Sequence, residues 1–138
     1  MDAPGPVDEP RGLVELARAA ERPRERVEGV DVIGPLRALR LDPNDLAALQ
    51  VRGLVLMQDH RFGDVRDMAS RVIARNADQP IFFGLLGDAE MEVGRYAEAE
   101  AAYQRMIDLR PNLASYSRGS WMRWLLGDVE GAVALARR

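Results

Sequence analysis

The residues that most often perform chemistry are few in this chain, and they are not grouped. It has one histidine, His60, and no cysteine, whereas a zinc site normally draws several ligands from these two residue types. Its serines lack the nucleophile-elbow pattern that exposes a reactive hydroxyl. They are Ser70, Ser115, Ser117 and Ser120. We therefore predict no metal site and no serine or cysteine nucleophile.

Glycines and paired acids do not form a catalytic pattern either. Gly84, Gly87 and Gly94 fall at helix-packing and turn spacing and do not form a phosphate-binding loop. Glu98 and Glu100 are two residues apart, so they point in different directions on a helix. The sequence therefore predicts a protein that is not an enzyme and that has no cofactor.

Composition and charge restrict the function classes further. The 138 residues are 47% hydrophobic and 30% charged, which is typical of a folded, water-soluble domain. The longest apolar run, residues 81–87, is far shorter than the ~20 residues that cross a bilayer. A net charge of -3 argues against a general nucleic-acid binder. With no secretory signal at its N-terminus, we expect a cytoplasmic protein that binds neither membrane nor nucleic acid.

The elements that carry these residues form an internal repeat. When the chain is laid over itself at a spacing of 34 residues, bulky and small positions match, as Gly53 does with Gly87. In a third copy one residue is deleted, so that Ser120 follows Gly87 at a spacing of 33. Within a copy, apolar residues recur at helical spacing in two segments, which predicts a pair of helices. The predicted copies are residues 46–79, 80–113 and the incomplete 113–138.

Capping and turn residues mark the helix ends. The predicted N-caps are Asn44 or Asp45, Asp78 and Asn112. Within the pairs, Gly94 and Gly127 can take the left-handed conformation that closes a helix. His60 occupies the equivalent place in the first copy, so we interpret it as a turn residue.

The N-terminal third is less regular. Residues 1–7 are predicted to be a flexible tail. Apolar residues from Leu13 to Ala20 suggest one helix, which ends near Pro23, and Val32 to Leu41 suggests another. We expect residues 8–45 to form a degenerate helix pair that caps the stack.

These features together resemble the tetratricopeptide repeat. The second copy carries nearly the whole motif, namely Leu86, Gly87, Gly94, Tyr96, Ala99, Tyr103 and Pro111. The first copy departs from it at Arg52, His60, Val65 and Ala77. The resemblance covers residues 46–138 and implies an all-α fold, a TPR-like α-solenoid of antiparallel helix pairs in a right-handed superhelical stack. In such a stack small residues at 53, 87 and 120 let neighbouring helices approach.

The resemblance also implies a binding face. Members of this family usually bind an extended peptide or a partner helix on the concave side, which the first helix of each pair lines. The partner-binding residues expected on this face are Gln50, Leu54, Met57, Asp88, Met91, Glu92, Arg118, Trp121 and Trp124. Asp88 and Glu92 point the same way on one helix, beside the two tryptophans, so a ligand with a cationic group and an apolar anchor would suit them. A solvated acidic pair, and tryptophans that pack against a following repeat, are the alternatives.

A terminal helix pair in a stack needs a polar outer face, and the last pair lacks one. Its final helix, Val129 to Arg138, is short and exposes Val133, Leu135 and Ala136. We expect either that the natural protein continues into further repeats or that two copies form a homodimer here. The leading hypothesis is a scaffold that binds a protein or peptide on its concave face. The alternative is a self-assembly module or a fragment of a longer TPR-containing regulator or enzyme.

Overall fold

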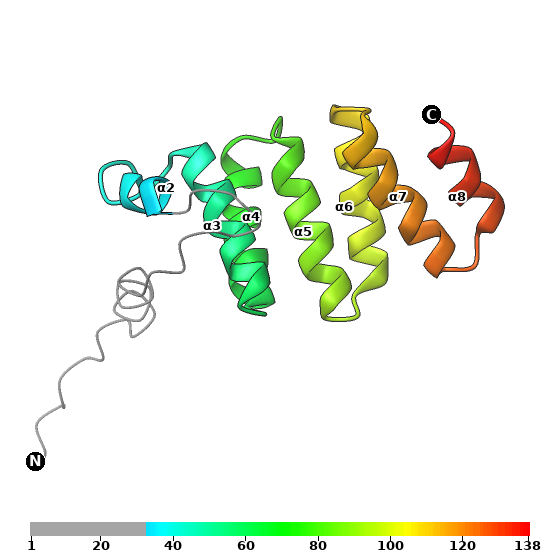
Figure 1. Ribbon diagram of the computed structural model, residues 1–138, viewed down its shortest axis with the longest axis horizontal. Coiled ribbons are helices and arrows are strands. Elements are labelled where there is room, and N and C mark those ends of the chain that lie inside the picture. Colours follow the sequence, from blue (N-terminus) through cyan, green and yellow to red (C-terminus); the bar gives the residue numbers. More distant parts are fainter. Residues whose placement is uncertain (1–32) are drawn as a thin grey trace, which may run out of the picture.

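The computed structural model describes residues 33–138, and every helix or strand assigned within them is an α-helix. The helices are α2 (Ile33–Ala38), α3 (Leu46–Gln58), α4 (Phe62–Arg75), α5 (Pro80–Glu92), α6 (Tyr96–Leu109), α7 (Leu113–Leu125) and α8 (Val129–Ala136). They follow one another along the molecule, with α2 near one end and α8 at the other (Figure 1). Helices that are adjacent in sequence pack together as pairs. The predicted all-α stack of helix pairs is confirmed.

The helix boundaries follow the repeat. The first helices of the three pairs begin at Leu46, Pro80 and Leu113, and the second helices begin at Phe62, Tyr96 and Val129. Both series advance by 34 and then by 33 residues, as the one-residue deletion in the third copy requires.

A tight turn of the same geometry joins the two helices of each pair. The residues with positive φ in these turns are His60 (55°), Gly94 (78°) and Gly127 (87°). In the first turn the N–H of Arg61 donates to the carbonyl of Leu56 at 2.9 Å, and the other two turns repeat this bond. This is the Schellman closure, which needs a left-handed residue. His60 is therefore a turn residue, as predicted, although it is not a glycine.

The predicted N-caps are correct at two of three helix starts. Asp45 and Asn112 each accept a hydrogen bond from a free N–H in the first turn of the following helix. The prediction of Asp78 as a cap is wrong, because α5 begins at Pro80 and its N-cap is Gln79. Proline suits the first helical position because its φ is already fixed and it has no N–H that needs a partner. The helix therefore starts at Pro80, beyond the reach of the Asp78 side chain.

The predicted N-terminal helix pair is described only in part. Helix α2 lies within the predicted segment 32–41 but ends at Ala38. It ends there because the N–H groups of Arg40 and Leu41 turn back to carbonyls three residues earlier. The predicted tail and the predicted helix from Leu13 to Ala20 lie outside the described residues. The cap over residues 8–45 stays a prediction.

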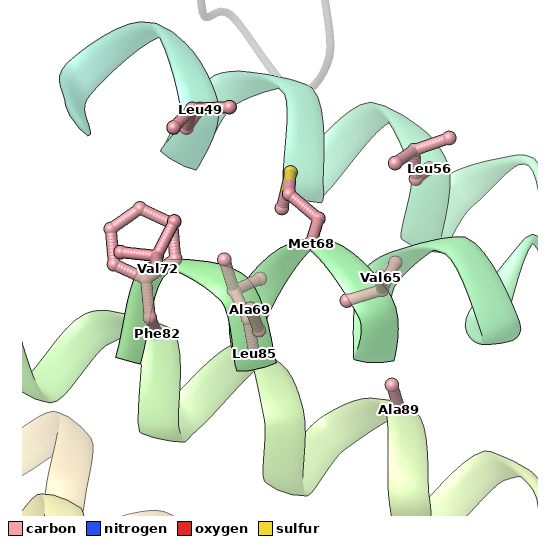
Figure 2. Packing of buried hydrophobic residues seen from close by; sticks show 9 residues of the cluster. All are labelled: Leu49, Leu56, Val65, Met68, Ala69, Val72, Phe82, Leu85 and Ala89. Atoms are coloured by element: carbon pink, nitrogen blue, oxygen red, sulfur yellow. The ribbon is translucent and has the colours of Figure 1, made fainter. Parts of the chain in front are cut away.

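The core lies between successive pairs. The larger cluster joins α3, α4 and α5 (Figure 2). Its buried members are Leu49, Leu56, Val65, Met68, Ala69, Val72, Phe82, Leu85 and Ala89. A second cluster joins α5, α6 and α7 through Met91, Ala99, Tyr103 and Met122. Each cluster draws on one pair and on the first helix of the next, so the core continues along the stack.

The three predicted small positions all lie against a neighbouring helix. A Cβ atom added at Gly53 would lie 2.7 Å from a methyl carbon of Leu85, and one added at Gly87 would lie 2.5 Å from the ring of Tyr103. Ser120 donates a hydrogen bond from Oγ to the carbonyl of Ala132 at 2.8 Å. The absence of a side chain at Gly53 and Gly87 is therefore a packing requirement, and Ser120 is bonded to α8.

Candidate interaction site

Three polar side chains from three successive helices meet beside the predicted face. Asp88 on α5 accepts a hydrogen bond from the hydroxyl of Tyr103 on α6 at 2.9 Å. The guanidinium of Arg118 on α7 donates to the same carboxylate, from Nε to Oδ1 at 2.9 Å and from a terminal nitrogen to Oδ2 at 2.8 Å. A bidentate pair of this kind fixes direction as well as distance. The cluster therefore holds α7 against α5 and α6.

The protonation states of this cluster are set by its surroundings. Burial raises the pKa of the Tyr103 phenol well above its usual value, and the charge of Asp88 raises it further. The hydrogen bonds that Arg118 donates to Asp88 raise the pKa of the guanidinium, although its burial acts in the opposite direction. Tyr103 stays a neutral donor and Arg118 stays charged at ordinary pH.

Asp88 and Glu92 differ in their surroundings, although the sequence predicted them as one acidic pair. Asp88 is partly buried and bonded to Arg118, whereas Glu92 is exposed at the end of α5. The cation beside Asp88 is thus supplied by the chain itself. This leaves Glu92 as the acid of the pair that faces solvent.

Several other residues of the predicted face are covered by neighbouring helices. Leu54 and Met57 are partly buried and pack against the larger core cluster. Met91 is 8% exposed and lies in the second cluster together with Met122 of α7. Gln50 is half-buried. Leu54, Met57 and Met91 thus lie at contacts between helices.

The two tryptophans occupy repeat positions whose equivalents in the preceding pair contact the first helix of the next pair. Asp88 and Met91 of α5 both meet α7. Thirty-three residues later, these two places are held by Trp121 and Trp124 of α7. No helix follows α8 in the described residues to cover them, and they are 50% and 59% exposed.

An apolar groove of about 660 Å³ lies between α7 and α8 beside the tryptophans. Its principal lining residues are Leu113, Tyr116, Trp121, Trp124, Val133 and Ala136. Arg138 is the single charged residue of the lining. We call this surface the α7–α8 groove. Exposed apolar side chains of α7 and α8 gather around it, and these two helices lie at one end of the stack (Figure 1).

Residues on both walls of this groove were missing from the predicted face. Leu113 and Tyr116 lie on one wall and α8 supplies the other. The repeat spacing indicates these wall residues, because Tyr116 is equivalent to Phe83 and Ala136 is equivalent to Tyr103. The third predicted exposed residue of α8, Leu135, is only half-exposed because it reaches back toward Gly119 of α7.

No group of three or more acidic or histidine side chains in residues 33–138 is arranged to hold a metal ion. The same residues contain no helix with the length and apolar character needed to span a membrane. A small, partly open space of about 10 Å³ between α6, α7 and α8 has room for about one water molecule.

Comparison with known proteins identifies the repeat. The family model described as "Tetratricopeptide repeat" matches residues 51–114 and, in a second overlapping match, residues 86–138. No curated protein matches the chain in sequence.

Solved structures with the same fold include two structures of MamA. The structure "MamA 41-end from Desulfovibrio magneticus RS-1" superposes with a TM-score of 0.64 at 21% identity, and the match covers 91% of this chain and 64% of that chain. A structure titled "Crystal structure of MamA" gives a TM-score of 0.63 at 17% identity and covers 91% and 67% of the two chains. This chain therefore spans about 64% of the length of the first structure, and the similarity establishes the fold.

Proposed function

The chain belongs to the tetratricopeptide repeat family, and on that premise we propose that it is a protein-interaction scaffold that binds a protein or peptide partner through the first helices of its pairs. We propose Trp121 and Trp124 as the main anchors. Its stacked pairs offer an extended surface of the kind that repeat proteins use for binding.

The observation that carries this proposal is the exposure of both tryptophans beside an apolar groove. A large indole ring in water is unfavourable, and contiguous apolar patches on a folded surface mark interaction sites. Tryptophan also contributes much contact area at a low entropic cost, which is why it is frequent among residues that dominate binding energy. The groove is apolar along most of its lining, so it suits an apolar segment of a partner.

The remaining residues of the predicted face have two roles in this proposal. Gln50 and Glu92 belong to the polar margin that a partner would contact, and Leu54 and Met57 offer partly covered apolar surface next to it. Asp88, Met91 and Arg118 act indirectly, because they fix the position of α7 and hence of the tryptophans. Substitution of these three is expected to alter stability as well as binding.

The test compares two aromatic residues that are similarly exposed. The immobilised wild-type chain is used to capture proteins from a lysate of its source organism, and the affinity of the captured partner is measured by calorimetry. Trp124→Ala should weaken that affinity by ~10-fold or more, as expected for an anchor residue. Tyr96→Ala should leave it unchanged, because Tyr96 is 45% exposed but lies on α6, outside the groove. Equal affinity of both variants and wild type would show that the proposed anchors are wrong.

A further inference from the structure

The contacts within the chain indicate what kind of segment the α7–α8 groove accepts. A surface of the same kind, between the two helices of a pair, occurs twice more in the chain, and each time a single helix fills it. Helix α5 packs on the pair α3–α4, and α7 packs on α6 and is joined to α5 by the Arg118–Asp88 ion pair. Helix α5 does so through Phe82, Leu85 and Ala89, whose spacing of three and four residues places them on one face. The groove therefore fits one helix with an apolar face of this spacing.

Helix α8 presents such a face to solvent. Val129, Val133 and Ala136 are spaced by four and three residues, so they share one side of the helix. All three are exposed, with Val129 at 55% and Val133 at 42%. Within residues 33–138, each copy of the chain thus carries a groove that no helix fills, and one wall of this groove is a helix with an uncovered apolar face.

We propose that the segment that fills this groove is α8 of a second copy of the chain. The proposal rests on the proposed function, because it names a partner for the Trp121–Trp124 surface. In the pair, α8 of each copy lies in the α7–α8 groove of the other, related by a two-fold axis. Such a self-complementary contact closes after two copies and covers both apolar surfaces together.

The charges on α8 favour an antiparallel arrangement. Glu130 lies in the first turn of α8, and Arg137 follows its last residue. They are seven residues apart, about two helical turns, so they lie on the same flank of the apolar face. In an antiparallel pair the equal flanks of the two helices meet, which brings Glu130 of one copy near Arg137 of the second copy, twice. Neither residue has an ion-pair partner among residues 33–138, and antiparallel helix dipoles add to the attraction.

Sedimentation velocity of the full chain over a range of concentrations tests the pairing. We expect a monomer that converts to a dimer as concentration rises, with a blue shift of tryptophan emission, since both tryptophans of the chain line the groove. Val133→Glu should raise the dimer dissociation constant by ~10-fold or more, because it places a charge in an apolar contact. Val93→Glu is the matched control, since Val93 is 44% exposed and lies far from the groove in sequence, after α5.

A charge exchange tests the orientation. Glu130→Arg should weaken the dimer by roughly 10-fold at low salt, because it replaces two attractive pairs with two repulsive ones. The double change Glu130→Arg with Arg137→Glu should restore the dimer. Failure of this rescue, with circular dichroism showing folded variants, overturns the antiparallel arrangement.

A wild-type chain that sediments as a monomer at every concentration overturns the pairing as a whole. The proposed function would still hold in that case if capture of another protein depended on Trp124. The proposed function has its own test, and it fails if Trp124→Ala binds the captured partner as tightly as Tyr96→Ala does in calorimetry.

Discussion

Arg118 of α7 and Asp88 of α5 form a bidentate ion pair. At the equivalent positions of the preceding helix pair, both residues are apolar. The residue equivalent to Asp88 in α3 is Leu54, and the residue equivalent to Arg118 in α5 is Leu85. Leu85 is fully buried in the larger core cluster, and Leu54 packs against that cluster. These two repeat positions thus hold apolar side chains in and against the core at one interface and an ion pair at the next.

This equivalence predicts the outcome of replacing the ion pair. Asp88→Leu alone should lower the free energy of unfolding by about 1 to 3 kcal/mol, because it leaves Arg118 and the Tyr103 hydroxyl without their acceptor. Arg118→Leu alone should also destabilise. The double variant Asp88→Leu with Arg118→Leu should be more stable than either single variant, since an apolar pair of suitable size can replace an ion pair and only the Tyr103 hydroxyl then lacks a partner. Urea unfolding of all four proteins decides this, and equal losses in the double variant and in the single variants would contradict it.

The contrast between local and distant contacts explains what could be predicted from the sequence. The starts of α3 and α7 and the left-handed turn at His60 follow from spacing and from neighbouring residues, so the sequence predicts them. The pairing of Asp88 with Arg118 joins residues 30 positions apart, and it depends on how α7 lies on α5, which the repeat pattern does not contain. For the same reason the sequence grouped Asp88 with Glu92, its neighbour on the helix.

The groove was only half predicted for a related reason. Trp121 and Trp124 were singled out by residue type and by the family resemblance. Their positions are contact positions for a further helix. This is evident only from the structure, in which the equivalent residues Asp88 and Met91 touch α7. The second wall, which α8 forms, follows from the repeat spacing, because Val129 and Ala136 are equivalent to Tyr96 and Tyr103 of α6.

The pKa of Tyr103 predicts a loss of stability at high pH. The unfolded chain ionises its tyrosines near pH 10, whereas burial and Asp88 keep the Tyr103 phenol neutral in the folded protein above that pH. The phenol therefore leaves the free energy of unfolding unchanged below about pH 10. This free energy falls as the pH rises further, because only the unfolded chain releases the phenolic proton. Urea unfolding between about pH 8 and pH 11 should show a smaller decline in Tyr103→Phe than in wild type. Tyr96→Phe, a change at an exposed tyrosine, should decline as wild type does, and an equal decline in Tyr103→Phe would exclude Tyr103 as the cause.

A second ion pair joins α4 to α5 around a buried acid. Glu90 is 6% exposed, and it accepts a hydrogen bond from Arg66 Nε at 2.9 Å, while Arg95 lies 3.5 Å from its other oxygen. Arg66→Ala should lower the free energy of unfolding by about 1 to 3 kcal/mol, because a buried carboxylate loses its closer cation. Arg71→Ala removes an exposed arginine of the same helix and should change stability by less than about 0.5 kcal/mol. Thermal melts of the two variants should therefore differ, and a pair of identical melting temperatures would argue against a stabilising role for this contact.

The turn between α5 and α6 predicts a backbone effect that is independent of packing. Gly94 has a φ of 78°, and no atom lies within 4 Å of a Cβ added to it. Gly94→Ala should therefore destabilise by about 1 kcal/mol through the left-handed backbone alone. Gly63→Ala also meets no atom within 4 Å but lies in α4 without a positive φ, so it should be neutral or stabilising by up to about 1 kcal/mol. Opposite signs in chemical denaturation are expected, and a stabilised Gly94→Ala would rule out strain at this turn.

The two inner glycines of α5 predict how much the stack depends on close helix contact. A Cβ added at Gly87 would lie 2.5 Å from a ring carbon of Tyr103, and this ring is held by its hydrogen bond to Asp88. A Cβ added at Gly84 would lie 2.9 Å from the sulfur of Met106, a flexible side chain that can move aside. Gly87→Ala should therefore cost about 1 to 3 kcal/mol of unfolding free energy, whereas Gly84→Ala should cost clearly less.

Both changes add one methyl group to the same helix, so the gain in helix propensity is equal and cancels in the comparison. The difference between their urea midpoints then measures how rigidly each neighbour is held. If Gly84→Ala proved as destabilising as Gly87→Ala, the rigidity of the Tyr103 ring, and with it the structural role of the Asp88 cluster, would have to be given up.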